Sequence, residues 1–274
     1  MATVDLGPIT VAFDDAGVGT PLVLVHGHPF DRSMWRPQFE RFSTAEWRVI
    51  VPDLRGYGDT SIVPGKTPLA TFVGDIAALL DRLGLDEVVL AGLSMGGQIV
   101  MEFYRLLPER VRALVLADTS PKADTADGRR ARNDAADRLL REGMEPYANE
   151  VLPKMIAPAN ITALPAVAEH VLRMMRRTPP AGAAAALRGR AERPDYVAML
   201  ATVTVPTLVV VGRDDVFTPI SEAELIAERV PQATLAVIDG AAHMPNLERP
   251  DAFNAALADF LDSVSARAAT AASS

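Results

Sequence analysis

Three side chains suited to nucleophilic catalysis, Ser94, Asp215 and His243, each lie a few residues after a short apolar run. A serine hydroxyl is a poor nucleophile near neutral pH, so it needs a base to take its proton, and that base needs an acid to orient it. Short apolar runs predict buried strands. Because the carboxyl ends of parallel strands meet at one edge of a sheet, we expect these three side chains to lie at the same edge.

Ser94 lies at the centre of Gly92-Leu93-Ser94-Met95-Gly96, between a predicted strand and a predicted helix at 98–107. A Gly-x-Ser-x-Gly sequence between a strand and a helix is the setting in which a serine nucleophile occupies a sharp, strained turn. The small residues at 92, 96 and 97 allow neighbouring backbone to approach closely. The amide of Met95 points to the same side and can stabilise an oxyanion. Taken alone, the pentapeptide also fits an ordinary glycine-rich turn.

Strands and helices alternate along most of the chain, which predicts an α/β fold with a parallel sheet covered on both faces. Two short strands, at 3–6 and 9–14, form a predicted hairpin at the start. Further strands are expected at 22–25, 48–51, 88–91, 111–117, 207–211 and 234–238, and further helices at 33–42, 68–83, 220–229 and 250–262. Gly84 ends the second helix, and the alanine- and serine-rich tail after Val264 is expected to fray.

The alternation of strands and helices stops between residues 121 and 194. This segment has no strand-like apolar run, holds 8 of the 21 prolines and has helical periodicity at 129–142 and 166–177. We therefore expect a helical cap at 121–194, inserted after the sixth strand of a core formed by 1–120 and 195–274. Such insertions often act as lids. Its 13 Lys/Arg and 9 Asp/Glu give a net charge of +4, which would attract anionic esters or belong to a solvated helical face.

Composition argues against several other classes of protein. The 274 residues include no cysteine, so disulfides, thiolate catalysis and thiolate metal sites are not expected. The net charge of −8 argues against a nucleic-acid partner. No apolar run is long enough to cross a membrane and no signal peptide is visible, so we expect a cytoplasmic protein with no membrane partner. No His-x-x-x-His or similar pairing occurs, so neither a metal nor a cofactor is predicted.

Five motifs in combination resemble those of the α/β-hydrolase superfamily over residues 3 to about 263. They are His26-Gly27-x-Pro29, Pro52-Asp53-Leu54-Arg55-Gly56-x-Gly58, Gly92-x-Ser94-Met95-Gly96-Gly97, Gly212-x-x-Asp215-x-x-x-Pro219 and Gly240-x-x-His243. The chain order Ser, Asp, His also matches. The resemblance implies a mostly parallel eight-stranded sheet flanked by helices, with Ser94 as nucleophile, His243 as general base and then acid, and Asp215 as orienting carboxylate. It also implies an oxyanion hole formed by the backbone amides of His28 and Met95.

Two other aspartates could supply the acid. Asp214 directly precedes Asp215, but the Gly-x-x-Asp spacing favours Asp215 as the acid. Asp118 follows an earlier strand, where some relatives carry the acid, and is otherwise interpreted as a loop or cap residue. Among the histidines, we expect His26 to be structural beneath its loop, His28 to face the pocket with its imidazole, and His170 to lie on a helix surface.

Within the superfamily, the chain resembles carboxylesterases, cofactor-free haloperoxidases (perhydrolases) and 3-oxoadipate enol-lactonases, through the segments 116–119 and 240–248. A serine nucleophile argues against the relatives that open epoxides or displace halide, which use an aspartate there. Enol-lactonases usually lack the His26-Gly27-x-Pro29 sequence, and haloperoxidases usually carry an aromatic residue in place of His28. We therefore expect a carboxylesterase for small to medium esters, with lactone hydrolysis or peroxide chemistry as alternatives.

The substrate is expected to be a small-molecule ester or lactone, and the protein a monomer or a homodimer. The residues expected to line the substrate pocket are Pro29, Phe30, Met144, Met155, Phe217 and Met244. Methionines in the insertion can shape an adaptable apolar wall, although packing in a helix core is the more common role of such methionines. A ligand receptor with weak turnover is the alternative from a different functional class, and multiple-turnover hydrolysis of simple esters would distinguish the two.

Overall fold

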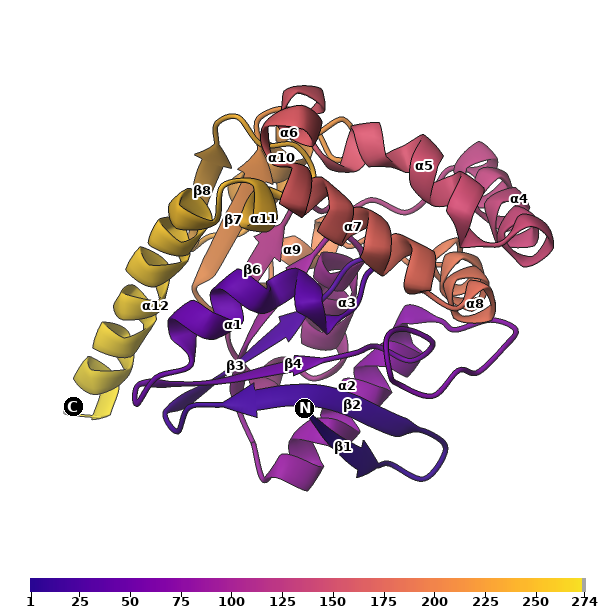
Figure 1. Cartoon of the computed structure of the whole chain (residues 1–274). Helices are drawn as coiled ribbons and strands as arrows, with labels where there is room; N and C mark the ends of the chain where they lie inside the picture. The colour runs from indigo at the N-terminus through magenta and orange to yellow at the C-terminus, as the bar shows by residue number, and fades with distance from the viewer. Residues whose placement is uncertain (273–274) are drawn as a thin grey trace.

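Eight strands form one sheet in the order β1-β2-β4-β3-β5-β6-β7-β8 in the computed structural model of the chain, which describes residues 1–272 (Figure 1). The strands are β1 (Ala2–Asp5), β2 (Thr10–Ala16), β3 (Thr20–Val25), β4 (Trp47–Pro52), β5 (Val88–Leu93), β6 (Val111–Ala117), β7 (Thr207–Gly212) and β8 (Ala233–Ile238). The β1–β2 and β2–β4 pairs are antiparallel and the others are parallel. The predicted mostly parallel eight-stranded sheet is confirmed.

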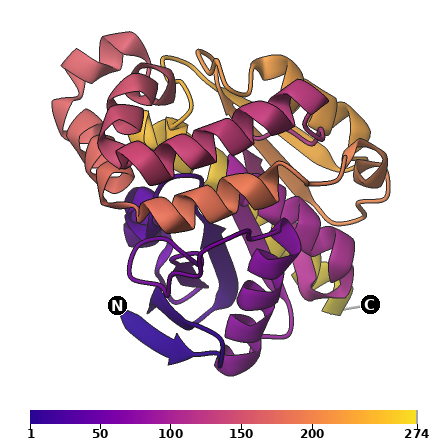
Figure 2. The same cartoon turned by 90° about the vertical axis from the view of Figure 1, so that its right-hand side faces the viewer.

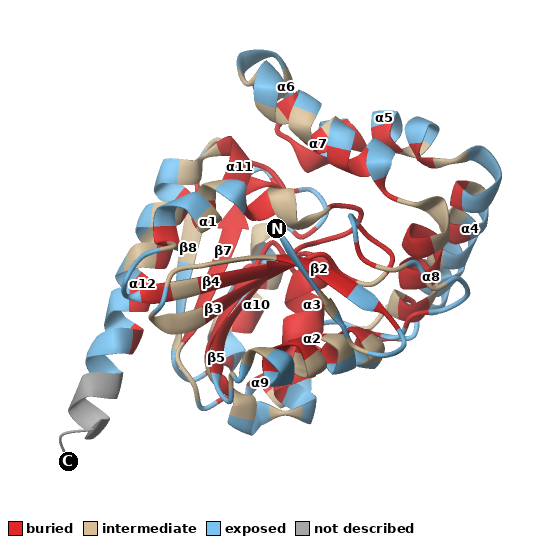
Figure 3. Cartoon of the chain, turned by 60° about the horizontal axis from the view of Figure 1, so that its bottom comes forward, coloured by how far each residue is buried: buried red, intermediate tan, exposed pale blue. Residues whose placement is uncertain are grey.

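Alternating side chains in the central strands divide the apolar core between the two faces of the sheet. In β3, Leu22 and Leu24 belong to one buried cluster, whereas Val23 and Val25 belong to another. The first cluster includes residues of α1 (Arg36–Phe42) and α12 (Pro250–Ala272), and the second includes residues of α2 (Leu69–Leu83), α3 (Met95–Leu106) and α10 (Ile220–Arg229). The central strands are buried and the outer helix surfaces exposed, as Figure 3 shows, whereas the edge strands β1 and β8 are partly exposed.

Five helices lie between residues 121 and 194. They are α4 (Ala126–Glu142), α5 (Met144–Met155), α6 (Pro158–Ala163), α7 (Pro165–Arg177) and α8 (Pro180–Arg190). Figures 1 and 2 show these helices as a layer across one side of the molecule, with α4 beside α8. Residues of α5 and α7 belong to the same buried cluster as α1 and α12, whereas α4 and α8 form a smaller cluster with Met144 of α5. Helix α8 also packs on the core, because Ala186 belongs to the second core cluster and the Thr67 amide donates to the Ala185 carbonyl over 2.9 Å. The layer is therefore anchored to the core through α5, α7 and α8.

The remaining elements of the chain are short. Two helix boundaries differ from those predicted from the sequence. The short elements are two 3₁₀ turns, η1 (Arg32–Trp35) and η2 (Pro108–Arg110), and the helices α9 (Val197–Leu200) and α11 (Pro245–Glu248). Helix α3 begins at Met95 rather than at 98. Helix α12 continues to Ala272, so the expected end at 262 is wrong. The segment expected to fray after Val264 is helical up to Ala272, and positions 273–274 lie outside the described residues. No helix within the described range is long and apolar enough to span a bilayer.

Candidate active site

Ser94 stands between β5 and α3 with φ 58° and ψ −117°, a conformation that non-glycine residues rarely adopt. The strain of such a residue costs about 1–3 kcal/mol and persists only where the surroundings enforce it. Here the enforcement comes from close backbone packing, because a Cβ at Gly96 would overlap the carbonyl oxygen of Val25 and a Cβ at Gly92 would overlap the Gly96 backbone. Ser94 is also tied to the next strand, since its amide donates to the carbonyl of Ala117 over 2.9 Å.

Asp215 and His243 form a buried pair on the loops that follow β7 and β8. His243 Nδ1 lies 2.8 Å from Asp215 Oδ2, and both residues are less than 5% exposed. Oδ1 of Asp215 accepts from the amides of Phe217 (2.8 Å) and Thr218 (3.2 Å), and the Thr218 hydroxyl donates to Oδ2. Burial alone would raise the pKa of Asp215, but the neighbouring imidazole and these hydrogen bonds outweigh it and lower the pKa. The carboxylate is thus fixed in both charge and orientation.

The two alternative acids have different environments. Asp214 is exposed, and its amide donates to the carbonyl of Ala241. Asp118 is fully buried, has a φ of 43° and accepts the amide of Gly212 on Oδ1 over 2.9 Å, while its Oδ2 has no hydrogen-bond partner. Burial raises the pKa of Asp118 well above its ordinary value, and the negative charge of Asp215 raises it further. Burial and the charge of Asp215 therefore favour the neutral form of Asp118 beside the Asp215–His243 pair.

The acidic side chains beside His243 do not fit a resident metal ion. Ligand atoms of Asp118, Asp215 and His243 lie within 4.8 Å of one another, which is close enough for a metal. However, His243 Nδ1 and both Asp215 oxygens are engaged in hydrogen bonds, and a divalent cation would require Asp118 to ionise. The donors of this group thus satisfy one another without a cation.

Two backbone amides near Ser94 have no acceptor among the described residues. Met95 is the first residue of α3, so its amide has no intrahelical partner. The amide of His28, in the loop after β3, likewise donates to no other group in this part of the chain. Free amides at a helix N-terminus are suited to stabilise a negatively charged oxygen.

The loop after β3 is held by its histidines. His26 Nδ1 lies 2.9 Å from the carbonyl of Gly27, and His26 Nε2 accepts the amide of Leu54 over 3.0 Å, so its expected structural environment beneath the loop is present. His28 Nδ1 lies 2.8 Å from the hydroxyl of Tyr57, whereas its Nε2 is buried without a partner. Burial lowers the pKa of His28 well below its ordinary value, and the cations Arg190 and Arg132 lower it further. The imidazole is therefore neutral.

Ser94, His243 and His28 line one cavity of about 350 Å³, here called the Ser94 cavity. Of the residues expected in the pocket, Met155 and Phe217 line it, and the Phe217 ring contacts His243 edge-on with centroids 5.2 Å apart. The other four do not: Phe30 and Met244 are fully buried in the core, Met144 packs in the small α4–α8 cluster, and Pro29 is buried in its loop.

Several polar residues of the Ser94 cavity were not found from the sequence. Gln98 lies one helical turn after Ser94, and Thr218 lies three residues after Asp215. Their spacing from these predicted catalytic residues could therefore have indicated that both lie at the site. Tyr147 and Arg190 come from the inserted helices, and no local pattern places them at the cavity. The structure also corrects His170, which was expected on a helix surface: this half-buried residue lies 3.2 Å from the carbonyl of Ser33 with its Nε2, and so joins α7 to the core.

A larger hollow, of about 610 Å³, lies away from Ser94. Arg32 lines this hollow and forms ion pairs with Asp14 (3.3 Å), Asp53 and Asp59 (2.9 Å). None of the predicted catalytic residues lines this hollow. The volume of a cavity alone therefore does not identify the active site of this protein, and the Ser94 cavity is the candidate active site.

The comparisons with known proteins agree with the fold. Residues 20–250 match the family model described as the alpha/beta hydrolase fold. A thermophilic esterase from Thermogutta terrifontis, solved with malate bound, is 40% identical over 93% of this chain and 94% of its own, with a TM-score of 0.91. The chain is 29% identical to 3-oxoadipate enol-lactonase 2 of Acinetobacter baylyi over 82% of both chains. A bromoperoxidase from Bacillus anthracis is 26% identical over 95% of this chain and 99% of its own, with a TM-score of 0.84.

A mostly parallel eight-stranded sheet with a strained serine after its fifth strand defines the class as an α/β hydrolase. The chain belongs to the α/β-hydrolase family, because the family model covers most of its length. The expected superfamily is therefore confirmed, and the relatives include esterases, an enol-lactonase and a bromoperoxidase.

Proposed function

We propose that the chain is a serine carboxylesterase in which Ser94 is the nucleophile, His243 the general base and Asp215 the orienting acid. The observation that carries this proposal is the buried 2.8 Å hydrogen bond between His243 Nδ1 and Asp215 Oδ2 in the wall of the cavity that holds Ser94. A donor hydrogen bond from Nδ1 to a carboxylate leaves Nε2 free to accept a proton. The strained Ser94 turn supports the same assignment, since strain of this kind is concentrated at functional sites.

Acylation follows from these roles. Ser94 Oγ bonds to the carbonyl carbon of the ester while His243 Nε2 takes the hydroxyl proton. The amides of Met95 and His28 stabilise the negative charge that develops on the carbonyl oxygen. The bond from carbon to the alcohol oxygen then breaks, and His243 gives its proton to the departing alcohol. Ser94 is left as an acyl ester.

Deacylation repeats the sequence with water. His243 Nε2 takes a proton from water as the water oxygen bonds to the acyl carbon, and the same amides stabilise the oxyanion. The bond between the acyl carbon and Ser94 Oγ breaks, and the proton returns to the serine. The products are a carboxylic acid and an alcohol, and no cofactor or metal is consumed in either step.

The helices between β6 and β7 complete this proposed site as a cap. We assign residues 121–194 to the cap and residues 1–120 and 195–274 to the catalytic core. Tyr147, Met155 and Leu187 of the inserted helices line the Ser94 cavity together with core residues, which supports this division. Acyl and alcohol preference would accordingly depend on the cap.

Lactone hydrolysis is the second candidate activity. The similarity to an enol-lactonase over 82% of the chain favours it, and the same serine, base and amides would serve. A lactone differs from an ester only in that its alcohol stays attached to the acyl group after the ring opens. A lactone therefore belongs in the substrate set of the first assay.

The test is hydrolysis of p-nitrophenyl acetate, butyrate and octanoate, and of a simple δ-lactone, by the wild type and Ser94→Ala. We expect steady multiple turnover by the wild type and a loss of about a thousandfold or more in Ser94→Ala, as follows the removal of a triad nucleophile. Ser263→Ala, an exposed serine on α12, is the matched control and should retain wild-type rates. Wild-type rates in Ser94→Ala would refute the assignment. A single turnover by the wild type would favour the receptor alternative.

A further inference from the structure

Arg190, the last residue of α8, reaches the wall of the Ser94 cavity without a carboxylate partner. Its Nε donates to Gln98 Oε1 over 2.7 Å. Among the described residues, no acid lies within ion-pair distance of Arg190, and its two terminal nitrogens form no hydrogen bond. An arginine side chain has five N–H donors and stays charged at neutral pH. The guanidinium group therefore presents its two terminal nitrogens without a protein acceptor.

The surrounding charges do not compensate for Arg190. Arg132 and Arg193 also line the Ser94 cavity, and both pair with one carboxylate, that of Asp124. Lys122 is paired with Glu222 at 2.5 Å. Two arginines thus share one acid and a third has none, so the wall carries an excess of positive charge. Burial lowers the pKa of Arg190 well below its ordinary value, and the positive charges of Arg132 and Arg193 lower it further.

Gln98 holds this cation close to the proposed nucleophile. Gln98 lies one turn after Ser94 on α3, and its backbone amide donates to the Ser94 carbonyl over 3.2 Å. Both residues line the same cavity as Arg190, so one small molecule can contact the serine and the guanidinium group together. A planar guanidinium with two free nitrogens matches the geometry of a carboxylate.

We propose that the Ser94 cavity selects esters or lactones that carry a carboxylate, which Arg190 binds with its terminal nitrogens while Ser94 attacks the carbonyl of the same molecule. This inference rests on the proposed function. A half-ester of a short dicarboxylic acid is the simplest member of this substrate class. Its hydrolysis follows the steps given above and needs no additional reactant, because the bound carboxylate takes no part in bond breaking.

The test compares two esters of similar length that differ in charge: mono-p-nitrophenyl succinate, which is an anion, and p-nitrophenyl butyrate, which is neutral. The quantity measured is the ratio of kcat/KM for the anionic ester to kcat/KM for the neutral one. We expect Arg190→Met to lower this ratio by about 10- to 100-fold, the range for loss of a charge-assisted hydrogen-bonded pair. Arg190→Lys, which keeps the charge but not the planar fork, should give an intermediate ratio.

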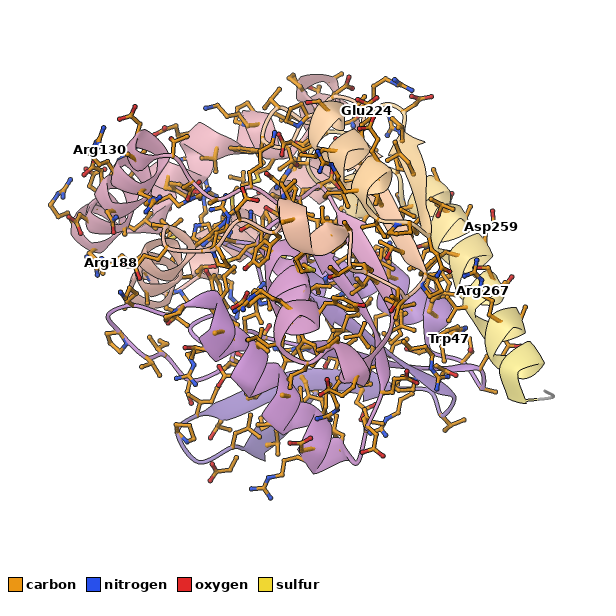
Figure 4. The ribbon with its side chains drawn as sticks, turned by 180° about the vertical axis from the view of Figure 1, so that it is seen from behind. Trp47, Arg130, Arg188, Glu224, Asp259 and Arg267 are labelled. Atoms are coloured by element: carbon orange, nitrogen blue, oxygen red, sulfur yellow. The ribbon has the colours of Figure 1, made fainter. Side chains whose placement is uncertain are left out.

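Arg188→Met is the matched control on the same helix. Arg188 pairs with Asp137 at 2.6 Å outside the Ser94 cavity, and Figure 4 shows it toward the outer end of the helical layer. This variant should leave the ratio of kcat/KM values unchanged. Because Arg190→Met removes a packed side chain, inhibition of the wild type gives a test that needs no variant. Succinate should inhibit butyrate-ester hydrolysis competitively, and succinamide, its neutral analogue, should not.

The outcomes separate this proposal from the proposed function. If the wild type prefers the neutral ester and Arg190→Met leaves the ratio unchanged, recognition of a carboxylate by Arg190 is wrong, while a Ser94-dependent esterase remains. If succinate and succinamide inhibit equally, the proposal is also overturned. If neither ester is hydrolysed by a Ser94-dependent route, the proposed function itself fails.

Discussion

Asp215→Asn replaces one carboxylate oxygen with an NH₂ group of almost the same size, and the structure determines which oxygen is replaced. The position of Oδ1 faces two backbone donors, the amides of Phe217 and Thr218. An NH₂ group there would set donor against donor. The NH₂ group must therefore take the position of Oδ2 and face His243 Nδ1.

This orientation of the asparagine selects the tautomer of His243 that cannot act as the general base. Since the NH₂ group can only donate, Nδ1 must accept, and the ring proton moves to Nε2. Nε2 is the atom that should take the Ser94 proton, so the base is blocked in its ground state. Exchange of a triad aspartate for asparagine lowers kcat by about 10⁴-fold through this tautomer effect. A loss of about 10⁴-fold raises the barrier by about 5–6 kcal/mol.

The assay is steady-state hydrolysis of p-nitrophenyl butyrate, with kcat and KM measured separately. Because Asp215 acts through His243, we expect the loss in kcat and a KM within a few-fold of the wild type. Asp214→Asn is the control, since Asp214 is the exposed neighbour and should keep kcat within about twofold. Thermal unfolding checks that both variants fold. If Asp215→Asn keeps more than about a tenth of the wild-type kcat, the argument from the two backbone donors is wrong.

Two further predictions concern stability. Asp118→Asn should remove part of the pH dependence of the stability of the fold. In the wild type, the raised pKa lets folded Asp118 keep a proton at pH values where the unfolded chain has lost it. The stability of the wild type therefore falls as the pH rises from the ordinary aspartate pKa through the raised pKa of the folded state. The melting temperature should therefore fall less between pH 5 and 8 in Asp118→Asn, and parallel curves for the two proteins would contradict this reasoning. Glu248→Ala should cost about 3–5 kcal/mol in urea unfolding, because the buried carboxylate accepts from the amides of Ala242 (2.8 Å) and Ala157 (2.9 Å) and from Asn160 (2.6 Å). The exposed Glu224→Ala (labelled in Figure 4) should change stability by less than about 0.5 kcal/mol, and an equal loss in both variants would count against the role of Glu248.

The sequence predicted the sheet and the candidate catalytic residues because both depend on local pattern. A hairpin pattern identified the first two strands and apolar runs the other six, and the spacing of the glycines around Ser94 identified the turn on which it lies. The choice of Asp215 over Asp214 also came from spacing, and it agrees with the observed burial of the first and exposure of the second.

The lining of the cavity could not be predicted in the same way. Phe30 and Met244 were expected at the cavity, but both side chains are buried in the core. Arg190 contacts Gln98 across 92 positions of sequence, and a basic residue at the end of a helix is usually a surface residue. Contacts between the inserted helices and the core depend on tertiary packing, which neither periodicity nor spacing reports.

The division of the inserted helices among the apolar clusters has a consequence for how such a protein can change over evolution. Buried residues of α5 and α7 belong to the same apolar cluster as those of α1 and α12. Substitutions of buried residues in α5 and α7 therefore affect the stability of the whole domain. The buried residues of α4, Ala136 and Leu139, lie only in the smaller cluster, yet Arg132 of α4 lines the Ser94 cavity. Helix α8 differs, because its Ala186 also packs in the core cluster that contains α2 and α3. Mutations in α4 can therefore alter which substrates are accepted at less cost to folding than mutations in α5, α7 or α8. New specificities would accumulate first on α4.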